Sequence, residues 1–217
     1  CVTSLGACNV PVDEWQLDVV ASGSQKGYMI PPGLSFIAMS PKAWKASEKS
    51  NLPKFYLNLK SYKKSLLSNS NPYTPAVNLV FALDEALNMM REEGLENIFF
   101  RHKKHKLAVS NAVKALNLEL FADENSLSPS ITAIKIEGIN AEEFRKTIKN
   151  KFDILLAGGQ DHLKGKIFRV GHLGYINDRD IITVISAISN ALLDLRKITA
   201  QEAGEALALA SKYLDAK

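Results

Sequence analysis

A lysine at the end of an apolar segment is the residue of this sequence best suited to covalent chemistry. Lys26 lies in the small-residue turn Ser22-Gly23-Ser24-Gln25-Lys26-Gly27, directly after the strand-like run 17–21. Small residues let a backbone approach a ligand closely, and serine hydroxyls can bond phosphate oxygens. An amine that is only half solvated loses its proton more easily and then forms a Schiff base with a carbonyl-bearing cofactor. The alternative is a lysine that points into water, because lysine is rarely buried.

An arginine inside a second apolar run is the other candidate for chemistry. Arg169 interrupts the strand-like segment Phe168-Arg169-Val170. Its planar guanidinium can bind a carboxylate through two parallel hydrogen bonds, as a substrate with a carboxylate would require. The alternative is an arginine at a strand edge that pairs with an acidic side chain of the protein itself.

The first part of the chain is expected to position Lys26. Short apolar runs alternate with Gly, Pro and Ser over residues 1–48, and the runs 18–21 and 34–39 are predicted to be strands. This pattern is typical of the last strands of an α/β sheet. These strands alone do not close a sheet.

A loop and two helices are expected next. Residues 50–75 are rich in Ser, Asn, Lys and Pro, which predicts a surface excursion between domains. Helical spacing from Ala76 to Met90 predicts a buried helix that ends at Gly94. A second helix, over about 95–116, is expected to bridge the two domains.

Strand and helix patterns alternate over the last part of the chain, which predicts a small α/β sandwich. Asn140 with Glu143, and Thr199 with Glu202, have the form of capping boxes at helix starts. The expected elements are strands over 131–136, 154–157 and 167–170 and helices that begin near residues 140, 178 and 199, the second of them capped by Asn177 or Asp178.

Composition restricts the function classes. The chain has 217 residues, 46 % hydrophobic and 23 % charged, with a net charge of +4, which suits anionic small molecules and not nucleic acid. Its two cysteines give neither a disulfide framework nor a metal-ligand cluster, so a reducing cytoplasm is expected. Because no apolar stretch approaches the roughly 18 to 20 residues of a membrane span, we expect no membrane partner.

Two histidines at helical spacing raise the question of a metal. His102 and His105 lie on the apolar stripe of the helix 95–116, with no third ligand in the sequence pattern, so no metal site is predicted. The surrounding basic run 101–106 is interpreted as a solvated face. His162 and His172 flank the Arg169 strand and are interpreted as structural residues or as residues that line the mouth of a site.

The chain resembles class V aminotransferases, in the alanine:glyoxylate (serine:pyruvate) branch. The segment Ala21-Ser22-Gly23-Ser24-Gln25-Lys26, followed by Pro31-Pro32-Gly33-Leu34-Ser35, is similar to the pyridoxal-phosphate lysine segment of that family. The resemblance covers nearly the whole chain in family order. It continues through Val2-Thr3-Ser4-Leu5-Gly6, Thr74-Pro75-Ala76-Val77 and Gly165-Lys166-Ile167-Phe168-Arg169-Val170-Gly171-His172-Leu173-Gly174.

The resemblance implies pyridoxal 5′-phosphate as cofactor and a role for particular residues. Lys26 would hold the cofactor as an aldimine and then act as general base, and Arg169 would bind the substrate α-carboxylate. Gln25 would contact the ring substituents, where cysteine desulfurases of the same fold carry histidine. The remaining implied cofactor contacts are Ser24 near the phosphate, Val2 and Ser4 along the ring, and Thr74 at the phosphate of the neighbouring subunit.

The fold implied is α/β: the C-terminal part of a fold-type I transferase, with the end of the large-domain sheet and a small α/β domain. The aspartate that pairs with the pyridine nitrogen in the family would fall immediately ahead of Cys1. We therefore expect the 217 residues alone to be inactive. The expected division is 1–48 for the cofactor domain, 49–94 for a connecting loop and dimer-interface helix, and 95–217 for the small domain.

Three functions remain open from the sequence. The first is a cytoplasmic, homodimeric aminotransferase with a shared active site, which moves an amino group from serine or alanine to glyoxylate or pyruvate. The second is a cysteine desulfurase or lyase of the same fold, against which Gln25 argues. The third is a non-catalytic remnant or subunit, since similar cyanobacterial sequences carry the label soluble hydrogenase small subunit.

The pattern Thr74-Pro75 also allows Thr74 to be a plain helix N-cap.

Overall fold

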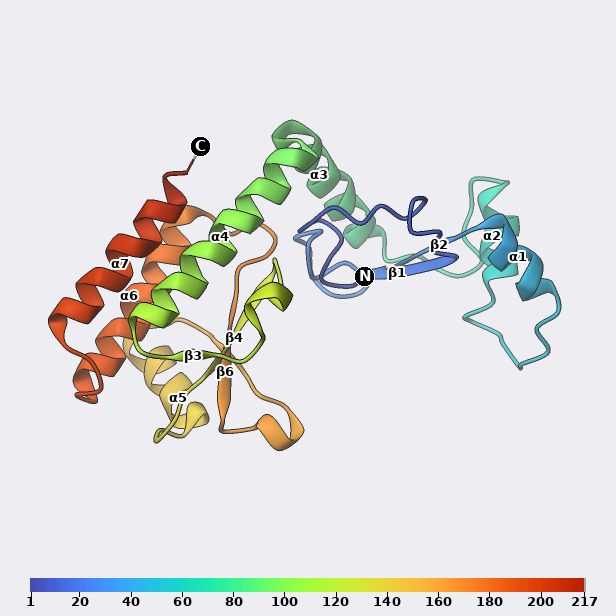
Figure 1. Ribbon diagram of the computed structural model, residues 1–217. Helices are drawn as coiled ribbons and strands as arrows, with labels where there is room; N and C mark the ends of the chain where they lie inside the picture. Colours follow the sequence, from blue (N-terminus) through green and yellow to red (C-terminus); the bar gives the residue numbers. More distant parts are fainter. Residues whose placement is uncertain (217) are drawn as a thin grey trace.

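The computed structural model describes residues 1–216. Its N-terminal part contains two antiparallel strands, β1 (Val19–Gly23) and β2 (Ser35–Met39), with Val19 opposite Met39 and Gly23 opposite Ser35. Both expected strands are therefore confirmed. The connection between them, residues 24–34, carries Lys26 (Figure 1).

Two short helices follow β2. They are α1 (Pro41–Glu48), capped by the Ser40 side chain, and α2 (Leu59–Leu66), capped by the Asn58 side chain. The prediction of a loop over 50–75 is wrong at α2. That helix buries none of its residues, so the polar composition that indicated a loop was compatible with an exposed helix.

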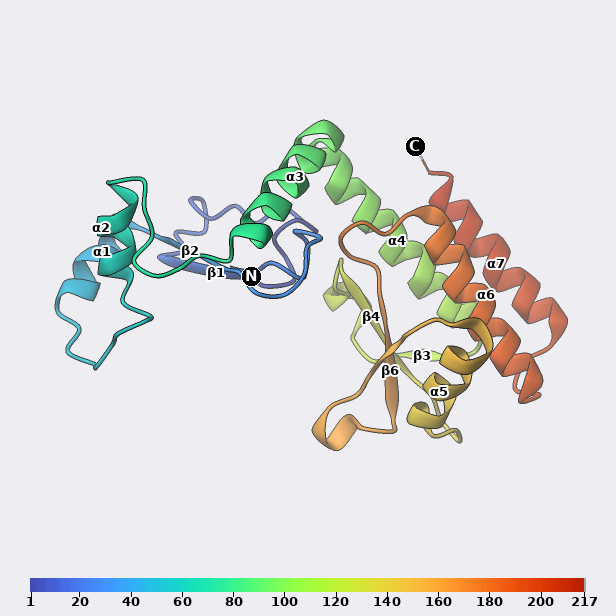
Figure 2. The same ribbon diagram turned by 180° about the vertical axis from the view of Figure 1, so that it is seen from behind.

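Two helices meet at Gly94 and join the N-terminal part to the C-terminal domain (Figures 1 and 2). These are α3 (Val77–Glu93) and α4 (Leu95–Ala115), and Gly94 between them has a φ of +83°. Glycine takes this left-handed conformation without the steric penalty of other residues. The predicted stop of α3 is confirmed, but α3 is not a buried helix, because only Ala86 and Met90 are buried along it.

The C-terminal domain has one four-stranded antiparallel sheet in the order β3-β4-β6-β5. Its helices pack together with α4 and cover one face of the sheet (Figure 1), which confirms the predicted α/β sandwich. The elements are β3 (Glu119–Leu120), η1 (Glu124–Ser126), β4 (Ile131–Lys135), α5 (Ala141–Phe152), β5 (Ala157–Gly158), η2 (Asp161–Leu163), β6 (Ile167–Gly171), α6 (Asp178–Asp194) and α7 (Ala200–Leu214).

The predicted N-caps of α5, α6 and α7 are confirmed, but one of the two predicted capping boxes is incomplete. Asn177 with Asp180 and Thr199 with Glu202 form capping boxes. Asn140 caps α5 by accepting from two backbone amides, but no reciprocal bond from Glu143 completes a capping box. The apolar run 154–157 is not a full strand either, since pairing with β6 begins only at Ala157 in β5.

No helix within residues 1–216 is both long enough and apolar enough to cross a lipid bilayer.

Candidate active site

Lys26 lies on a turn that Ser24 stabilises. The fully buried Ser24 hydroxyl donates to the Pro31 carbonyl at 2.8 Å and accepts from the Leu34 amide at 3.1 Å, and so holds the two ends of the β1–β2 connection together. The Met29 amide closes the turn by donating to the Lys26 carbonyl at 3.0 Å. Lys26 itself is half-buried, and no carboxylate in residues 1–216 forms an ion pair with it.

The segment that contains Val2 and Ser4 packs against the same turn. The Cys1 nitrogen donates to the Ala21 carbonyl of β1 at 3.0 Å. A side chain at Gly27 would collide with the Leu5 carbonyl oxygen, so this glycine is required for the close approach of the two segments. The structure therefore brings the predicted residues at 2, 4 and 24–26 into one region of the N-terminal part.

Gln25 and Thr74 are exposed. Thr74 does not cap α3: the N-cap position is Ala76, without a side-chain hydrogen bond, so the alternative of a plain N-cap is wrong. Leu79 of α3 lies against Gly33 of the β1–β2 connection. The start of α3 is thus tied to the segment that carries Lys26, although Thr74 itself makes no hydrogen bond to that segment within residues 1–216.

Arg169 lies in the middle of β6, opposite Ala133 of β4 and Ala157 of β5. Its neighbours Phe168 and Val170 belong to the core under the helices. Since side chains alternate between the faces of a strand, Arg169 points to the face that the helices leave uncovered.

The guanidinium of Arg169 is available to bind a carboxylate. Its Nε donates to the Gly158 carbonyl at 2.9 Å, and no carboxylate of residues 1–216 lies within ion-pair distance. By contrast, Arg101 and Arg145 are each paired with a glutamate. The alternative of an edge-strand arginine paired with an acid is therefore wrong, because β6 is an inner strand and Arg169 has no acidic partner in the described chain.

Gly174, three residues after β6, lies against the turn that carries Lys26. It is buried, and a Cβ at this position would lie 3.4 Å from the Lys26 carbonyl oxygen. In both ribbon views the segment after β6 runs beside the N-terminal loops (Figures 1 and 2). The strand that holds Arg169 thus leads directly into a contact with the turn that holds Lys26.

The basic run 101–106 is not a solvated face, contrary to the prediction. His102 and His105 are fully buried. His105 Nε2 donates to Asp178 at 2.8 Å, and Lys104 pairs with the same carboxylate. The helix α4 faces other helices on several sides, so its polar residues are paired inside the domain. Within residues 1–216 no group of three or more His, Cys, Asp or Glu is arranged to hold a metal ion.

His172 is also fully buried, whereas His162 is exposed. His172 Nε2 lies 2.9 Å from the Thr132 hydroxyl. Burial, and after it the nearby His105 and His102, lower the pKa of His172 to about 3.

Acid is therefore expected to destabilise the fold through His172. Its pKa in the folded protein is below the unfolded value of 6.5, so the unfolded state binds the proton more tightly, and stability is lost as the pH falls from 6.5 toward 3. At about pH 5 this one group costs about 2 kcal/mol. In denaturant unfolding at a series of pH values, the free energy of unfolding should fall less steeply with decreasing pH in His172→Gln than in the unaltered protein. Equal slopes would contradict the assignment.

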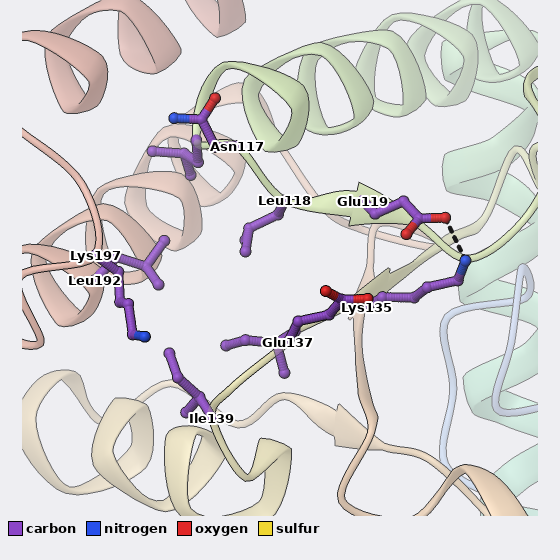
Figure 3. Close-up of a pocket in the computed structure, with 10 residues that line it drawn as sticks. Asn117, Leu118, Glu119, Lys135, Glu137, Ile139, Leu192 and Lys197 are labelled. Carbon is purple, nitrogen blue, oxygen red and sulfur yellow. Dashed lines mark hydrogen bonds and ion pairs between the residues drawn. The ribbon is translucent and has the colours of Figure 1, made fainter.

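A separate cavity of about 320 Å³ lies in the C-terminal domain (Figure 3). Its floor is apolar, with Leu118, Ile139 and Leu192, and its rim carries the Glu119–Lys135 ion pair and Lys197. None of the residues predicted for the active site lines this cavity.

Sequence reasoning did not predict that Arg101 and His102 of α4 form hydrogen bonds with the backbone of Gly174. The signal present in the sequence was the Gly-His-Leu-Gly segment after Arg169. The partners of Gly174 in this segment, Arg101 and His102 on α4, lie 73 and 72 residues earlier in the chain. A single sequence contains no periodicity that links such distant positions.

Comparison with known proteins shows which family the chain matches. The family model for class V aminotransferases matches residues 1–173. The chain is 55 % identical over 213 residues to the soluble hydrogenase small subunit of Synechococcus sp. (strain PCC 6716), covering 98 % of this chain and 55 % of the relative. It is 36 % identical over 221 residues to the serine–glyoxylate aminotransferase of Methylorubrum extorquens (98 % and 54 %).

A solved structure shows the same fold. Ureidoglycine–glyoxylate aminotransferase from Bacillus subtilis superimposes with a TM-score of 0.89 at 30 % identity, covering 97 % of this chain and 56 % of that one. The chain thus spans about half the length of the relatives that it matches. The family match, the fold and the lysine-bearing turn agree, and the chain belongs to the class V aminotransferase family, as the C-terminal part of a fold-type I architecture.

Proposed function

We propose that this chain supplies the lysine and the carboxylate-binding arginine of a transaminase, which moves an amino group from a small amino acid such as serine or alanine to glyoxylate or pyruvate. The observation that carries the proposal is the pair Lys26 and Arg169. Both cations lack acidic partners in residues 1–216, and both are attached to segments that meet at Gly174. An unpaired amine and an unpaired guanidinium suit a carbonyl compound and a carboxylate.

Family membership implies pyridoxal 5′-phosphate, and the residues present fit that group. A half-buried primary amine without an ionic partner is the chemistry that an aldehyde cofactor requires. When bound, the cofactor supplies an electron sink beside the amino-acid Cα–H bond. The residues proposed to hold it are Lys26, Gln25, Ser24, Val2, Ser4 and, from the second subunit, Thr74.

The chain's own residues have distinct tasks in this scheme. Arg169 orients the substrate by binding its α-carboxylate through its Nη groups, which pair with no carboxylate of residues 1–216. Lys26 Nζ moves a proton at the substrate Cα. Ser24 shapes the turn through its two hydrogen bonds, so its side chain contributes to the position of Lys26 in addition to any contact with a phosphate.

We propose a homodimer in the cytoplasm as the working form. Apolar side chains are exposed on the segment from α2 to α3, including Leu67, Val80 and Phe81, and exposed apolar patches of this kind mark protein interfaces. The residues 1–48, 49–94 and 95–217 would then be the cofactor domain, the interface and the small domain. Both cysteines are free, as a reducing compartment requires.

An assay of the holoenzyme with serine or alanine and with glyoxylate or pyruvate tests this function. We expect formation of the new amino acid at a rate that depends on both substrates, in a ping-pong pattern. Release of sulfide from cysteine without amino transfer would indicate the desulfurase or lyase instead. Isotope exchange from hydrogen gas without amino transfer would support a hydrogenase subunit, as the name of the Synechococcus relative states.

A further inference from the structure

Gly174 is held at both of its backbone polar atoms by neighbouring residues of α4. His102 Nε2 accepts a hydrogen bond from the Gly174 amide at 3.2 Å. Arg101 Nη1 donates to the Gly174 carbonyl at 2.9 Å and to the Ile176 carbonyl at 3.1 Å. We call Arg101, His102 and Gly174 the α4 clasp. Two consecutive side chains of one helix thus fix the position of the turn after β6.

The proton arrangement of His102 suits this contact. Its Nδ1 lies 2.7 Å from the Ile98 carbonyl, and a carbonyl only accepts, so Nδ1 carries the proton and Nε2 is free to accept from Gly174. Burial lowers the pKa of His102, which keeps the ring neutral. The carbonyl contact therefore sets the tautomer that the clasp needs.

Arg101 is fixed from its other side by the end of α3. Its guanidinium donates twice to the Glu93 carboxylate, from Nε at 2.5 Å and from Nη2 at 2.9 Å. Glu93 is the last residue of α3, immediately before Gly94. Planar double contacts of this kind restrict the orientation of an arginine. Glu93 therefore links the α4 clasp to the junction between α3 and α4.

The opposite side of Gly174 faces the Lys26 turn. A Cβ at Gly174 would lie 3.4 Å from the Lys26 carbonyl and 3.4 Å from Met29 Cγ, and the φ of Gly174 is +76°. Both the space and the backbone conformation favour glycine. The segment after β6 that contains Gly174 is also tied to the sheet that holds Arg169, because the His172 amide donates to the Ser130 carbonyl at 3.0 Å.

We propose that Arg101 and His102 are positioning residues of the transaminase site: they hold Gly174 against the Lys26 turn and so set the placement of Lys26 relative to Arg169. This inference rests on the proposed function. Neither side chain is proposed to contact substrate or cofactor. The two act on amino-acid binding through Gly174, because a shift of that residue moves the lysine-bearing turn away from the strand that binds the carboxylate.

Replacement of His102 by leucine and by glutamine in the holoenzyme separates positioning from general stability. Leucine removes the acceptor, whereas the glutamine amide oxygen can reach the place of Nε2. In His102→Leu we expect KM for the amino donor to rise about tenfold, the effect of one lost hydrogen bond in a buried site. His102→Gln should restore KM to within about threefold. Replacement of the exposed neighbour Lys103 by leucine is the matched control on α4 and should leave KM unchanged.

A second measurement does not depend on activity. Amide hydrogen exchange should increase in His102→Leu both in the peptide around Gly174 and in the peptide that contains residues 24–30, with the rest of the domain unchanged. Gly174→Ala, which keeps both α4 side chains, should give the same exchange pattern and the same rise in KM. This variant replaces His102→Leu if the latter does not fold.

The outcomes decide between the possibilities. Faster exchange around Gly174 alone, with residues 24–30 unchanged, would overturn the coupling to Lys26. A uniform increase across the domain without rescue of KM by glutamine would show a merely structural histidine and would also overturn it. If the unaltered holoenzyme transfers no amino group, the exchange pattern still tests the clasp, so failure of the proposed function is distinguished from failure of this inference.

Discussion

Lys26→Ala is expected to lower the transamination rate by about 10³- to 10⁴-fold. The amine of Lys26 has no carboxylate partner in the described chain, and no other lysine lies in the turn 22–27 that Ser24 and Gly27 shape. Removal of the amine would therefore remove both the proposed attachment point of the cofactor and the proposed base for the Cα proton. Initial rates with saturating substrates, compared at equal protein concentration, measure the effect.

A covalent trapping experiment gives an independent reading of the same residue. Borohydride reduction of the holoenzyme followed by peptide mapping should place the cofactor label on the peptide that contains Lys26. Lys103→Ala is a suitable control, because Lys103 is exposed, and this variant should keep both the label and the rate. A label on a different lysine, or full activity in Lys26→Ala, would contradict the assignment.

Arg169→Met is expected to raise KM for the amino acid about 100-fold, which corresponds to about 3 kcal/mol of binding free energy. The guanidinium stands on the face of the sheet that the helices leave uncovered, and within residues 1–216 only its Nε is hydrogen-bonded, to Gly158. A substrate carboxylate would receive the two Nη groups, and loss of both contacts leaves the carboxylate unpaired. Arg169→Lys keeps the charge without the planar fork and should raise KM about tenfold.

The substrate itself provides a sharp control for Arg169. An amine with the same side chain but no carboxylate should react equally slowly with the unaltered protein and with Arg169→Met, because it does not use the guanidinium. Arg179→Met, at an exposed arginine of α6, should leave KM unchanged. A similar loss for the amine and for the amino acid would show that Arg169 supports the sheet and does not bind the carboxylate.

Local signals in the sequence predicted most of the elements that surround the site. The glycine stop at Gly94, the helix cap at Asn177 and the capping box at Thr199 were readable because each depends on residues at most three positions apart. The expected strands before and after the Lys26 turn were also confirmed. The elements that were misjudged, α2 and β5, are short, and their formation depends on exposure or on a partner strand.

The surroundings of the basic run on α4 could not be predicted from the sequence. Charge and spacing indicated a solvated face, but Arg101 is bonded to Glu93 and to backbone carbonyls, while His105 is bonded to Asp178. Burial of these groups is acceptable only because each finds a partner. Those partners lie on α3, on α6 and in the turn after β6, and which of them come within reach depends on how α4 packs.

The sequence by itself determined the chemical groups and their local setting: an amine after a strand, an arginine within a strand, and the glycines that allow tight turns. Only the tertiary structure decided that Arg169 has no acidic partner in the described chain and that α4 holds Gly174 against the Lys26 turn. The physical reason is the separation along the sequence of the residues in contact. Caps and strand alternation depend on contacts between near neighbours, whereas pairing and burial depend on which distant segments the packed core brings together.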